Sequence, residues 1–214
     1  MRRSAVVLAN GRRPTRETLR SYVQRSDLFL AADGALDFAL AAGLTPDYVV
    51  GDFDSVSGEA LRAIDPATLI RIEDQQLCDL EKALNLAVDL QVEQVIVLGA
   101  LGKRMDHSLT SLSVGLRLAH RVSIRLIDGG TELIPVVSEA LLQGSPGDTV
   151  SLIVWEPVRG VTLSGVRWPL HDEDLAPGSR CVSNVLIESS AAVSVREGRL
   201  IACRIRRPRS GRSA

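Results

Sequence analysis

Short apolar segments alternate with helical patterns over the first 130 residues, and this alternation limits the folds that the chain can adopt. Each segment has the length and the Val, Ile, Leu and Ala content of a buried strand. The expected strands cover residues 4–9, 28–32, 47–50, 68–72, 94–98 and 122–127. The expected helices cover residues 14–25, with Pro14 favourable at a first helical position, 35–42, 57–64, 79–88 and 108–120. Strands that alternate with helices predict an α/β domain with a largely parallel sheet.

The pattern changes after Asp128-Gly129-Gly130. Short β-type segments follow one another, separated by turns rich in Gly, Pro and Ser and without intervening helices. They cover residues 131–137, 148–155, 160–163, 182–189, 191–195 and 200–205. Such a series predicts an all-β domain, and we expect a β-sandwich. The chain therefore divides into an α/β domain of residues 1–130 and an all-β domain of residues 131–214, which ends in a basic tail that begins at Arg204 and fits a frayed, solvated terminus better than a nucleic-acid site.

The composition excludes several classes of protein. The net charge of -1 gives no sign of nucleic-acid or membrane binding. No apolar run approaches the ~18 residues of a membrane span, and the run from Ala5 to Ala9 is shorter than a signal peptide requires. The three cysteines, Cys78, Cys181 and Cys203, are odd in number and widely spaced. They predict a reducing cytoplasm, without a disulfide framework or a zinc site.

Five aspartates lie where expected strands end or the following helices begin. They are Asp33, Asp52, Asp54, Asp79 and Asp106. In parallel sheets ligands bind beyond the carboxyl ends of the strands, so we expect these side chains to converge there. Asp52 and Asp54 are two residues apart in Gly51-Asp52-Phe53-Asp54-Ser55 and point to the same side of an extended backbone. Burying such a pair is costly without a cation, and oxygen ligands suit Mg²⁺.

A simpler interpretation is a polar loop with solvated acids, because a pair of aspartates is a short and common motif. Asp79 and Asp106 also suit the N-cap of a helix. The convergence of five acids beside Lys103 and Arg104 nevertheless favours a site for a metal ion and phosphate.

The basic residues give a second indication. Of 25 lysines and arginines only Lys82 and Lys103 are lysines. A compact ammonium differs from a planar guanidinium, so both positions are candidates for a requirement that arginine does not meet, although two residues could also survive by chance. Lys82 follows Asp79 by three residues on one helix face, where a local ion pair contributes little.

The glycine-rich stretch from Gly99 to His107 lacks the spacing of a Walker A loop. Its glycines would still let backbone amides approach a phosphate, and the fork of Arg104 could bind phosphate oxygens. Transfer of a phosphoryl-type group to an alcohol also needs a group that accepts the hydroxyl proton. Asp79 and Asp106 both qualify, and the sequence does not choose between them.

Taken together, these motifs resemble the thiamine pyrophosphokinase family. The first part of the chain contributes Ala32-Asp33-Gly34, Gly51-Asp52-Phe53-Asp54-Ser55, Cys78-Asp79-Leu80-Glu81-Lys82-Ala83-Leu84 and the stretch from Gly99 to His107. The second part contributes Gly165-Val166-Arg167-Trp168-Pro169-Leu170 and Ser183-Asn184. The resemblance runs in order from about residue 5 to about residue 205.

The resemblance implies an ATP-binding catalytic α/β domain, a thiamine-binding β-sandwich and a homodimer, for which we expect an active site shared between subunits. It implies Mg²⁺-dependent transfer of pyrophosphate from ATP to the hydroxyl of thiamine, which releases AMP. The expected catalytic residues are Asp52, Asp54, Asp79 and Asp106, of which Asp52, Asp54 and Asp79 are also the expected metal ligands. The expected ATP-binding residues are Asp33, Lys82, Lys103, Arg104 and Asp106. The expected thiamine-binding residues are Trp168, Ser183 and Asn184, with the Trp168 ring suited to a cationic thiazolium.

Some positions depart from the family pattern. Gln76 and Cys78 stand where the family often has Asp and Thr, and Val166 and Arg167 stand where Leu and Lys are usual. Two other functions are open: a related pyrophosphokinase that acts on a pterin alcohol, and a thiamine- or nucleotide-binding regulator without turnover. An assay of AMP release with different acceptor alcohols would separate these functions.

Overall fold

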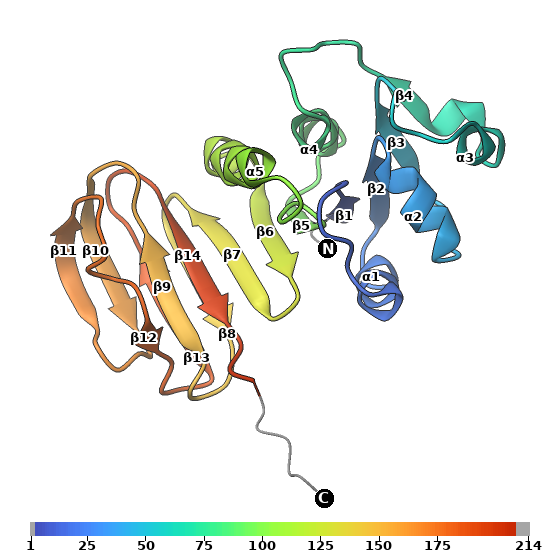
Figure 1. Ribbon diagram of the computed structural model, residues 1–214. Coiled ribbons are helices and arrows are strands. Elements are labelled where there is room, and N and C mark those ends of the chain that lie inside the picture. Colours follow the sequence, from blue (N-terminus) through green and yellow to red (C-terminus); the bar gives the residue numbers. More distant parts are fainter. Residues whose placement is uncertain (1–2, 209–214) are drawn as a thin grey trace, which may run out of the picture. The chain divides into compact units, whose positions relative to one another are not determined.

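A computed structural model describes residues 3–208 and divides the chain into two compact units, with the boundary between Asp128 and Gly129. Unit 1 holds a parallel sheet whose strands lie in the order β6-β5-β1-β2-β3-β4 (Figure 1). The strands are β1 (Ser4–Leu8), β2 (Leu28–Ala32), β3 (Tyr48–Gly51), β4 (Leu69–Arg71), β5 (Gln94–Leu98) and β6 (Ser123–Asp128). The helices are α1 (Arg16–Val23), α2 (Ala35–Ala41), α3 (Gly58–Arg62), α4 (Asp79–Asp89) and α5 (Met105–Leu118), with a 3-10 turn, η1 (Pro66–Thr68).

The helices of unit 1 pack on the sheet through apolar side chains. Leu19 of α1 and Ala39 of α2 share a core cluster with Val6 and Phe29 of the sheet. Helix α4 packs against β2 and β3. This packing places the first turn of α4, with Asp79, near the carboxyl ends of β2 and β3, where the sequence predicts a site.

Two helix starts differ from the sequence-based expectation. Pro14 precedes the N-cap instead of opening α1, because the hydroxyl of Thr15 accepts the N–H of Thr18 at 3.1 Å. Helix α5 begins at Met105 rather than Ser108, since the extended backbone of Arg104 forms its N-cap. Asp106 consequently lies in the first turn of a helix and not in a loop.

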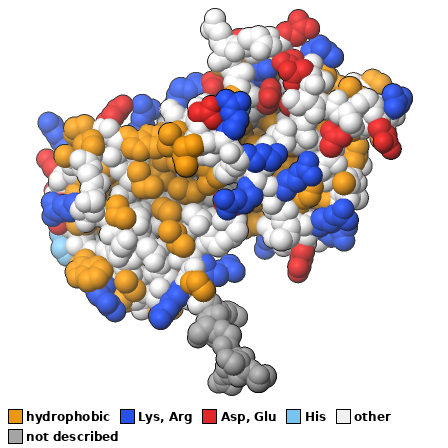
Figure 2. Space-filling view, in the orientation of Figure 1, with side chains coloured by type: hydrophobic (Ala, Val, Ile, Leu, Met, Phe, Trp, Pro, Cys, Tyr) orange, Lys and Arg blue, Asp and Glu red, His pale blue; other side chains and the backbone are white. Residues whose placement is uncertain are grey.

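Unit 2 consists of two antiparallel sheets with the strand orders β12-β9-β14-β7 and β11-β10-β13-β8. Its strands are β7 (Thr131–Val136), β8 (Glu139–Gln143), β9 (Thr149–Ile153), β10 (Val158–Ser164), β11 (Leu170–Leu175), β12 (Asn184–Val185), β13 (Ser190–Ser194) and β14 (Leu200–Ile205). Both sheets contribute to one hydrophobic core, for example through Leu152 of β9 and Leu163 of β10. Unit 2 is therefore an all-β, two-layered unit, as the sequence predicts. Hydrophobic side chains also gather on its visible face (Figure 2).

The sequence pattern misses two of these strands and overstates another. β11 reads Leu-His-Asp-Glu-Asp-Leu, and only its two terminal leucines are buried, so no alternation reveals it. β8 buries only Leu142. The expected strand at residues 182–189 is reduced to the two residues of β12.

The basic tail is less frayed than predicted at its start. Arg204 is almost buried on β14, where its guanidinium lies 3.4 Å from Glu132 and 3.3 Å from Asp148. Burial alone would raise the pKa of Asp148, but the N–H groups of Arg207 and Ser145 and the Arg204 guanidinium outweigh it and leave this pKa lowered. Residues 209–214, with the rest of the tail, lie outside the described residues.

Among residues 3–208, no helix combines the length and the apolar character that crossing a bilayer requires.

Candidate active site

Three carboxylates meet at the carboxyl edge of the unit 1 sheet. Asp33 follows β2, and Asp52 and Asp54 follow the neighbouring strand β3. One oxygen from each lies within 4.8 Å of the others. Asp33 is buried, Asp52 is partly buried and Asp54 is exposed. The group thus offers only oxygen ligands, and it extends from a buried carboxylate to an exposed one. Three like charges this close together favour a cation between them.

The backbone conformation around Asp33 allows its carboxylate to lie close to the segment that follows β3. Asp33 adopts a left-handed conformation (φ 46°), and its Oδ1 accepts the N–H of Phe53 at 2.9 Å. Gly51 passes so close that a Cβ there would lie 2.8 Å from the Cβ and Oδ1 of Asp33. Only glycine leaves room for the buried carboxylate, which gives a physical reason for the Gly in Gly51-Asp52-Phe53-Asp54-Ser55.

Asp52 is oriented by partners that the sequence analysis did not identify. Its Oδ2 accepts the side-chain amide of Gln75 at 3.0 Å, and its Oδ1 accepts the N–H of Asp54 at 3.2 Å. These two hydrogen bonds, that of Gln75 first, lower the pKa of Asp52. Arg71 donates to the Asp52 carbonyl at 2.9 Å and stacks over the Phe53 ring. The only indication of this contact in the sequence is that Gln75 lies in the segment that departs from the family pattern.

Asp79 lies outside this group but close to it, in the first turn of α4. Burial raises the pKa of Asp79, with the charges of Asp33 and Asp52 adding to the shift, although Lys82 opposes it. The ammonium of Lys82 lies 3.2 Å from Asp79, and the Lys82 side chain is only 3% exposed. The packing of α4 on the sheet thus buries this ammonium beside the acids, a burial that the position of Lys82 on a helix face did not predict.

A cleft of about 480 Å³ opens next to the acidic group. The loops after β1, β2 and β5 form it together with the starts of α4 and α5. Five of the predicted residues line it: Asp33, Asp79, Lys103, Arg104 and Asp106. Further lining residues that the sequence analysis did not assign to a site are Asn10, Ser55 and Thr110. One cleft thus joins acids from β2 and α4 to cations that follow β5.

The loop after β5 is held against the loop after β1. Gly11 donates to the Gly99 carbonyl at 2.6 Å, and a Cβ at Gly11 would lie 2.3 Å from that oxygen. Lys103 has a left-handed backbone (φ 55°), and its ammonium donates to the Asn10 carbonyl at 2.9 Å. Asn10 belongs to a dipeptide that reads as an ordinary turn in the sequence, so its place beside Lys103 was not predictable.

Arg104 and Asp106 pair with each other on the exposed rim of the cleft. The guanidinium donates to both carboxylate oxygens, at 3.1 and 2.6 Å, and Oδ1 also accepts the N–H of His107. The hydrogen bonds from Arg104, and to a smaller extent that from the His107 N–H, lower the pKa of Asp106 to about 2. The pairing with Asp106 also raises the pKa of Arg104. Asp106 therefore remains ionised and engaged, which makes it a weak acceptor for a proton.

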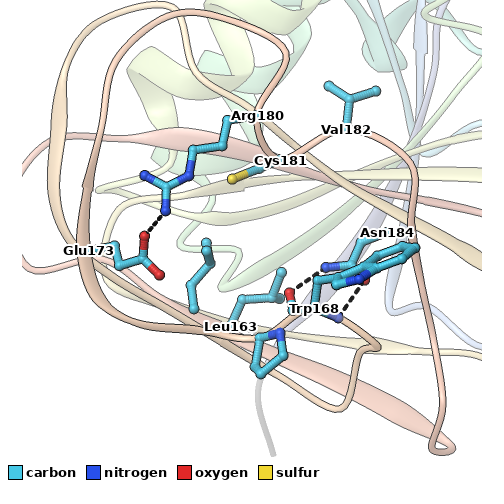
Figure 3. A pocket seen from close by; sticks show the side chains of 9 residues that line it. Leu163, Trp168, Glu173, Arg180, Cys181, Val182 and Asn184 are labelled. Carbon is cyan, nitrogen blue, oxygen red and sulfur yellow. Dashed lines mark hydrogen bonds and ion pairs between the residues drawn. The ribbon is translucent and has the colours of Figure 1, made fainter.

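A second pocket, of about 250 Å³, lies in unit 2 (Figure 3). Its lining residues are Leu163, Trp168, Pro169, Leu170, Glu173, Arg180, Cys181, Val182 and Asn184. The buried Asn184 holds the backbone of Trp168 from both sides: it donates to the carbonyl at 2.6 Å and accepts the N–H at 3.1 Å. The Trp168 side chain remains exposed, and the Arg167 guanidinium lies 5.6 Å from its ring centre.

Ser183 adjoins this pocket without lining it. Its backbone is left-handed (φ 67°), and its N–H donates to the hydroxyl of Ser151 at 3.0 Å. Two of the three residues predicted to bind thiamine, Trp168 and Asn184, are thus brought to one pocket.

An α/β unit that gathers oxygen ligands and cations at one cleft, joined to a β unit with an aromatic-walled pocket, defines the class of phosphotransferase that acts on a small acceptor. Family comparisons agree with this class. The model described as thiamin pyrophosphokinase, catalytic domain, matches residues 19–127, and that described as thiamin pyrophosphokinase, vitamin B1 binding domain, matches residues 139–200. The chain belongs to the thiamine pyrophosphokinase family.

Individual relatives match over almost the whole chain. Thiamine pyrophosphokinase of Bacillus subtilis is 28% identical over 206 residues, which cover 92% of this chain and 96% of the relative. The crystal structure of the B. subtilis protein superposes with a TM-score of 0.83 at 26% identity, covering 95% of this chain and 99% of the other. The crystal structure of thiamin pyrophosphokinase from Geobacillus thermodenitrificans gives a TM-score of 0.81 at 28% identity, with 98% and 99% coverage.

Proposed function

We propose that this chain is an enzyme that transfers the pyrophosphoryl group of ATP to the hydroxyl of thiamine, giving thiamine diphosphate and AMP. The observation that carries the proposal is the acidic group at the cleft of unit 1, in the unit that matches the catalytic model of the family. The pocket walled by Trp168, in the unit that matches the vitamin B1 binding model, supports the choice of acceptor.

The donor set fits Mg²⁺. Asp33, Asp52 and Asp54 offer carboxylate oxygens within 4.8 Å of one another, and the hydrogen bonds to Asp52 keep that carboxylate ionised and oriented. We assign the metal to these three residues, so that Asp33 takes the place that the sequence analysis gave to Asp79. When bound, Mg²⁺ neutralises polyphosphate charge and holds the phosphate oxygens in position.

The cations of the cleft bind the phosphates in this proposal. Lys103 and Arg104 line the same cleft as Asp33 and Asp79, and each has a hydrogen-bond partner, Asn10 and Asp106 respectively. Exchange of those partners for phosphate oxygens would bring a compact ammonium and a planar fork to the nucleotide. Lys82 has another role, because its buried ammonium offsets the negative charge of Asp79 and the neighbouring acids.

The hydroxyl of the acceptor must lose a proton as the new bond forms. Both oxygens of Asp106 already accept hydrogen bonds from Arg104. Asp79 lines the same cleft, and only one of its oxygens faces Lys82. This geometry favours Asp79 as the proton acceptor, with Lys82 positioning it.

Thiamine is assigned to the pocket in unit 2, with its thiazolium on the exposed Trp168 ring, whose backbone Asn184 holds. We also propose that the chain acts as a homodimer in which this pocket of one subunit completes the cleft of the other. The exposure of Trp168 (58%), Val182 (49%) and Ile187 (52%) supports burial against a partner. The three cysteines are free, which suits the reducing cytoplasm in which we propose that the enzyme works.

The test is AMP formation by the purified chain from ATP, thiamine and Mg²⁺, with a chelator as the control for the metal. We expect AMP and thiamine diphosphate in equal amounts, and no AMP without thiamine. AMP formation with a pterin alcohol instead of thiamine would transfer the assignment to that related kinase. Binding of thiamine and ATP without any AMP would assign the chain to the class of non-catalytic regulators.

A further inference from the structure

One ion pair lies in the pocket of unit 2 and has no role in the chemistry described above. Glu173 and Arg180 line the pocket and bond to each other, at the opposite end from Trp168 and Asn184 (Figure 3). The other lining residues are apolar apart from Cys181 and Asn184, so this pair supplies the formal charges of the lining. A charge beside apolar walls acts more strongly on a ligand than one in open solvent.

The two partners differ in how firmly they are held. Glu173 belongs to β11, where it pairs in register with Val161 of β10, and its side chain is 32% exposed. Arg180 lies in the segment between β11 and β12, and its side chain is 64% exposed. Figure 3 shows the second oxygen of Glu173 turned away from Arg180, toward the middle of the lining side chains. The anion therefore lies on a paired strand, whereas the cation lies outside the strands and is mostly exposed to water.

The Trp168 ring repeats this arrangement. Its π face attracts cations, and the exposed guanidinium of Arg167 already lies 5.6 Å from its centre. Each group in the pocket that attracts a cation is thus matched by an arginine from an exposed segment. With Arg180 in place the formal charges of the lining cancel, and with Arg180 withdrawn the lining carries one negative charge.

We propose that Glu173 is the counter-ion of the cationic ring of the acceptor and that Arg180 is the resident cation that the acceptor displaces. The ion pair then selects a positively charged acceptor over a neutral one of the same shape. This inference rests on the proposed function, because it takes thiamine, with its permanently charged thiazolium, as the acceptor.

Two substitutions separate this role from a structural one, because they act in opposite directions. Glu173→Gln removes the counter-ion and should raise the KM for thiamine roughly two- to fivefold, the range of a partly exposed charge pair. Arg180→Gln removes the competing cation and should lower the same KM by a similar factor. The double variant, whose lining carries no formal charge, should have a KM for thiamine between the values of the two single variants. If the pair only closed the pocket, both single substitutions would raise KM.

The ligand provides a second comparison. An analogue in which a neutral thiophene replaces the thiazolium keeps the hydroxyl and the shape but carries no charge on that ring. Its KM, and its Kd from titration calorimetry on the intact protein, should respond to neither substitution. Asp172→Asn and Arg196→Gln are the matched controls: they break a neighbouring exposed ion pair of 2.6 Å outside the pocket lining, and the left-handed backbone of Asp172 (φ 53°) accepts Asn.

The outcomes distinguish the inference from the proposed function. A wild-type chain that forms no AMP from thiamine would overturn the proposed function, while the Kd values for thiamine would still test the ion pair. An active wild-type chain in which both Glu173→Gln and Arg180→Gln raise KM would overturn the inference alone. Equal shifts for thiamine and the neutral analogue, or shifts of the same size in the controls, would also overturn it.

Discussion

Replacing Lys82 by Met should destabilise the protein in a way that Mg²⁺ partly reverses. The Lys82 ammonium is buried against Asp79, and its charge also lowers the pKa of Asp52. Methionine keeps the length and apolar stem of the side chain but removes the charge. The acids at the sheet edge then repel one another without an internal cation, whereas a bound metal ion would restore one.

The size of the effect follows from the burial of the two partners. Removing one member of a fully buried pair costs roughly 3–5 kcal/mol, and exposed pairs contribute at most about 1 kcal/mol. Lys82 is 3% exposed and Asp79 is 40% exposed, which places this pair between the two limits. We expect a loss of about 2 kcal/mol, or a fall in Tm of ~4–8 °C for a protein of this size. Lys82→Arg should be as harmful, because an enclosed site has no room for a guanidinium.

The assay is thermal unfolding at low ionic strength, with and without Mg²⁺, and Lys103→Met is the matched control. Lys103 is exposed, so its replacement should change the stability by less than about 0.5 kcal/mol while it lowers turnover. A Lys82→Met protein with the Tm of wild type, or a deficit that Mg²⁺ leaves unchanged, would refute the charge-balancing role. Full activity of both Lys82→Arg and Lys103→Arg would show that the choice of lysine has no chemical cause.

Three further results are expected. Asp52→Asn or Asp54→Asn should reduce AMP formation by a few orders of magnitude, and Asp54→Asn should also raise the Tm without ligand, because a crowded carboxylate is neutralised; near wild-type turnover would contradict the metal assignment. Co-expression of two inactive chains, Asp54→Asn and Trp168→Ala, should restore about a quarter of wild-type activity, since half of the dimers are mixed and one of their two sites is intact. No recovery in mixed dimers verified by mass would exclude a shared site. Asp148→Asn should destabilise the protein most at neutral pH. Because folding lowers the pKa of Asp148, its contribution to stability is fully present above the ordinary value of 3.8 and is lost as the pH falls through the lower pKa of the folded state. The Tm values of the variant and of wild type should therefore approach each other as the pH falls below 3.8.

Most of unit 1 can be predicted from the sequence because each strand and helix is recognisable from the spacing of its own apolar residues. β2 and β5 begin and end at the residues expected from their apolar runs. The meeting of Asp33 with Asp52 and Asp54 follows from topology alone, since neighbouring parallel strands end at one edge. These features need no knowledge of side-chain packing.

The features that the sequence did not predict depend on loops and on tertiary packing. Gln75 donates to Asp52 from a loop, and the conformation of a loop does not follow from the spacing of apolar residues. Asn10 accepts a hydrogen bond from Lys103, which is 93 residues away in the sequence. The burial of Lys82 results from how α4 packs on the sheet. β11 escapes detection because its middle residues are polar, yet it carries Glu173 to the pocket.

The left-handed backbone of Lys103 closes one route by which this protein could gain stability against heat. A non-glycine residue in that conformation costs about 1–2 kcal/mol, which glycine would recover. Selection for thermal tolerance alone would therefore favour Lys103→Gly, and this substitution would also remove a cation from the cleft. At this position heat resistance and catalysis select opposite residues, so lineages under both demands would have to gain their stability elsewhere in the chain.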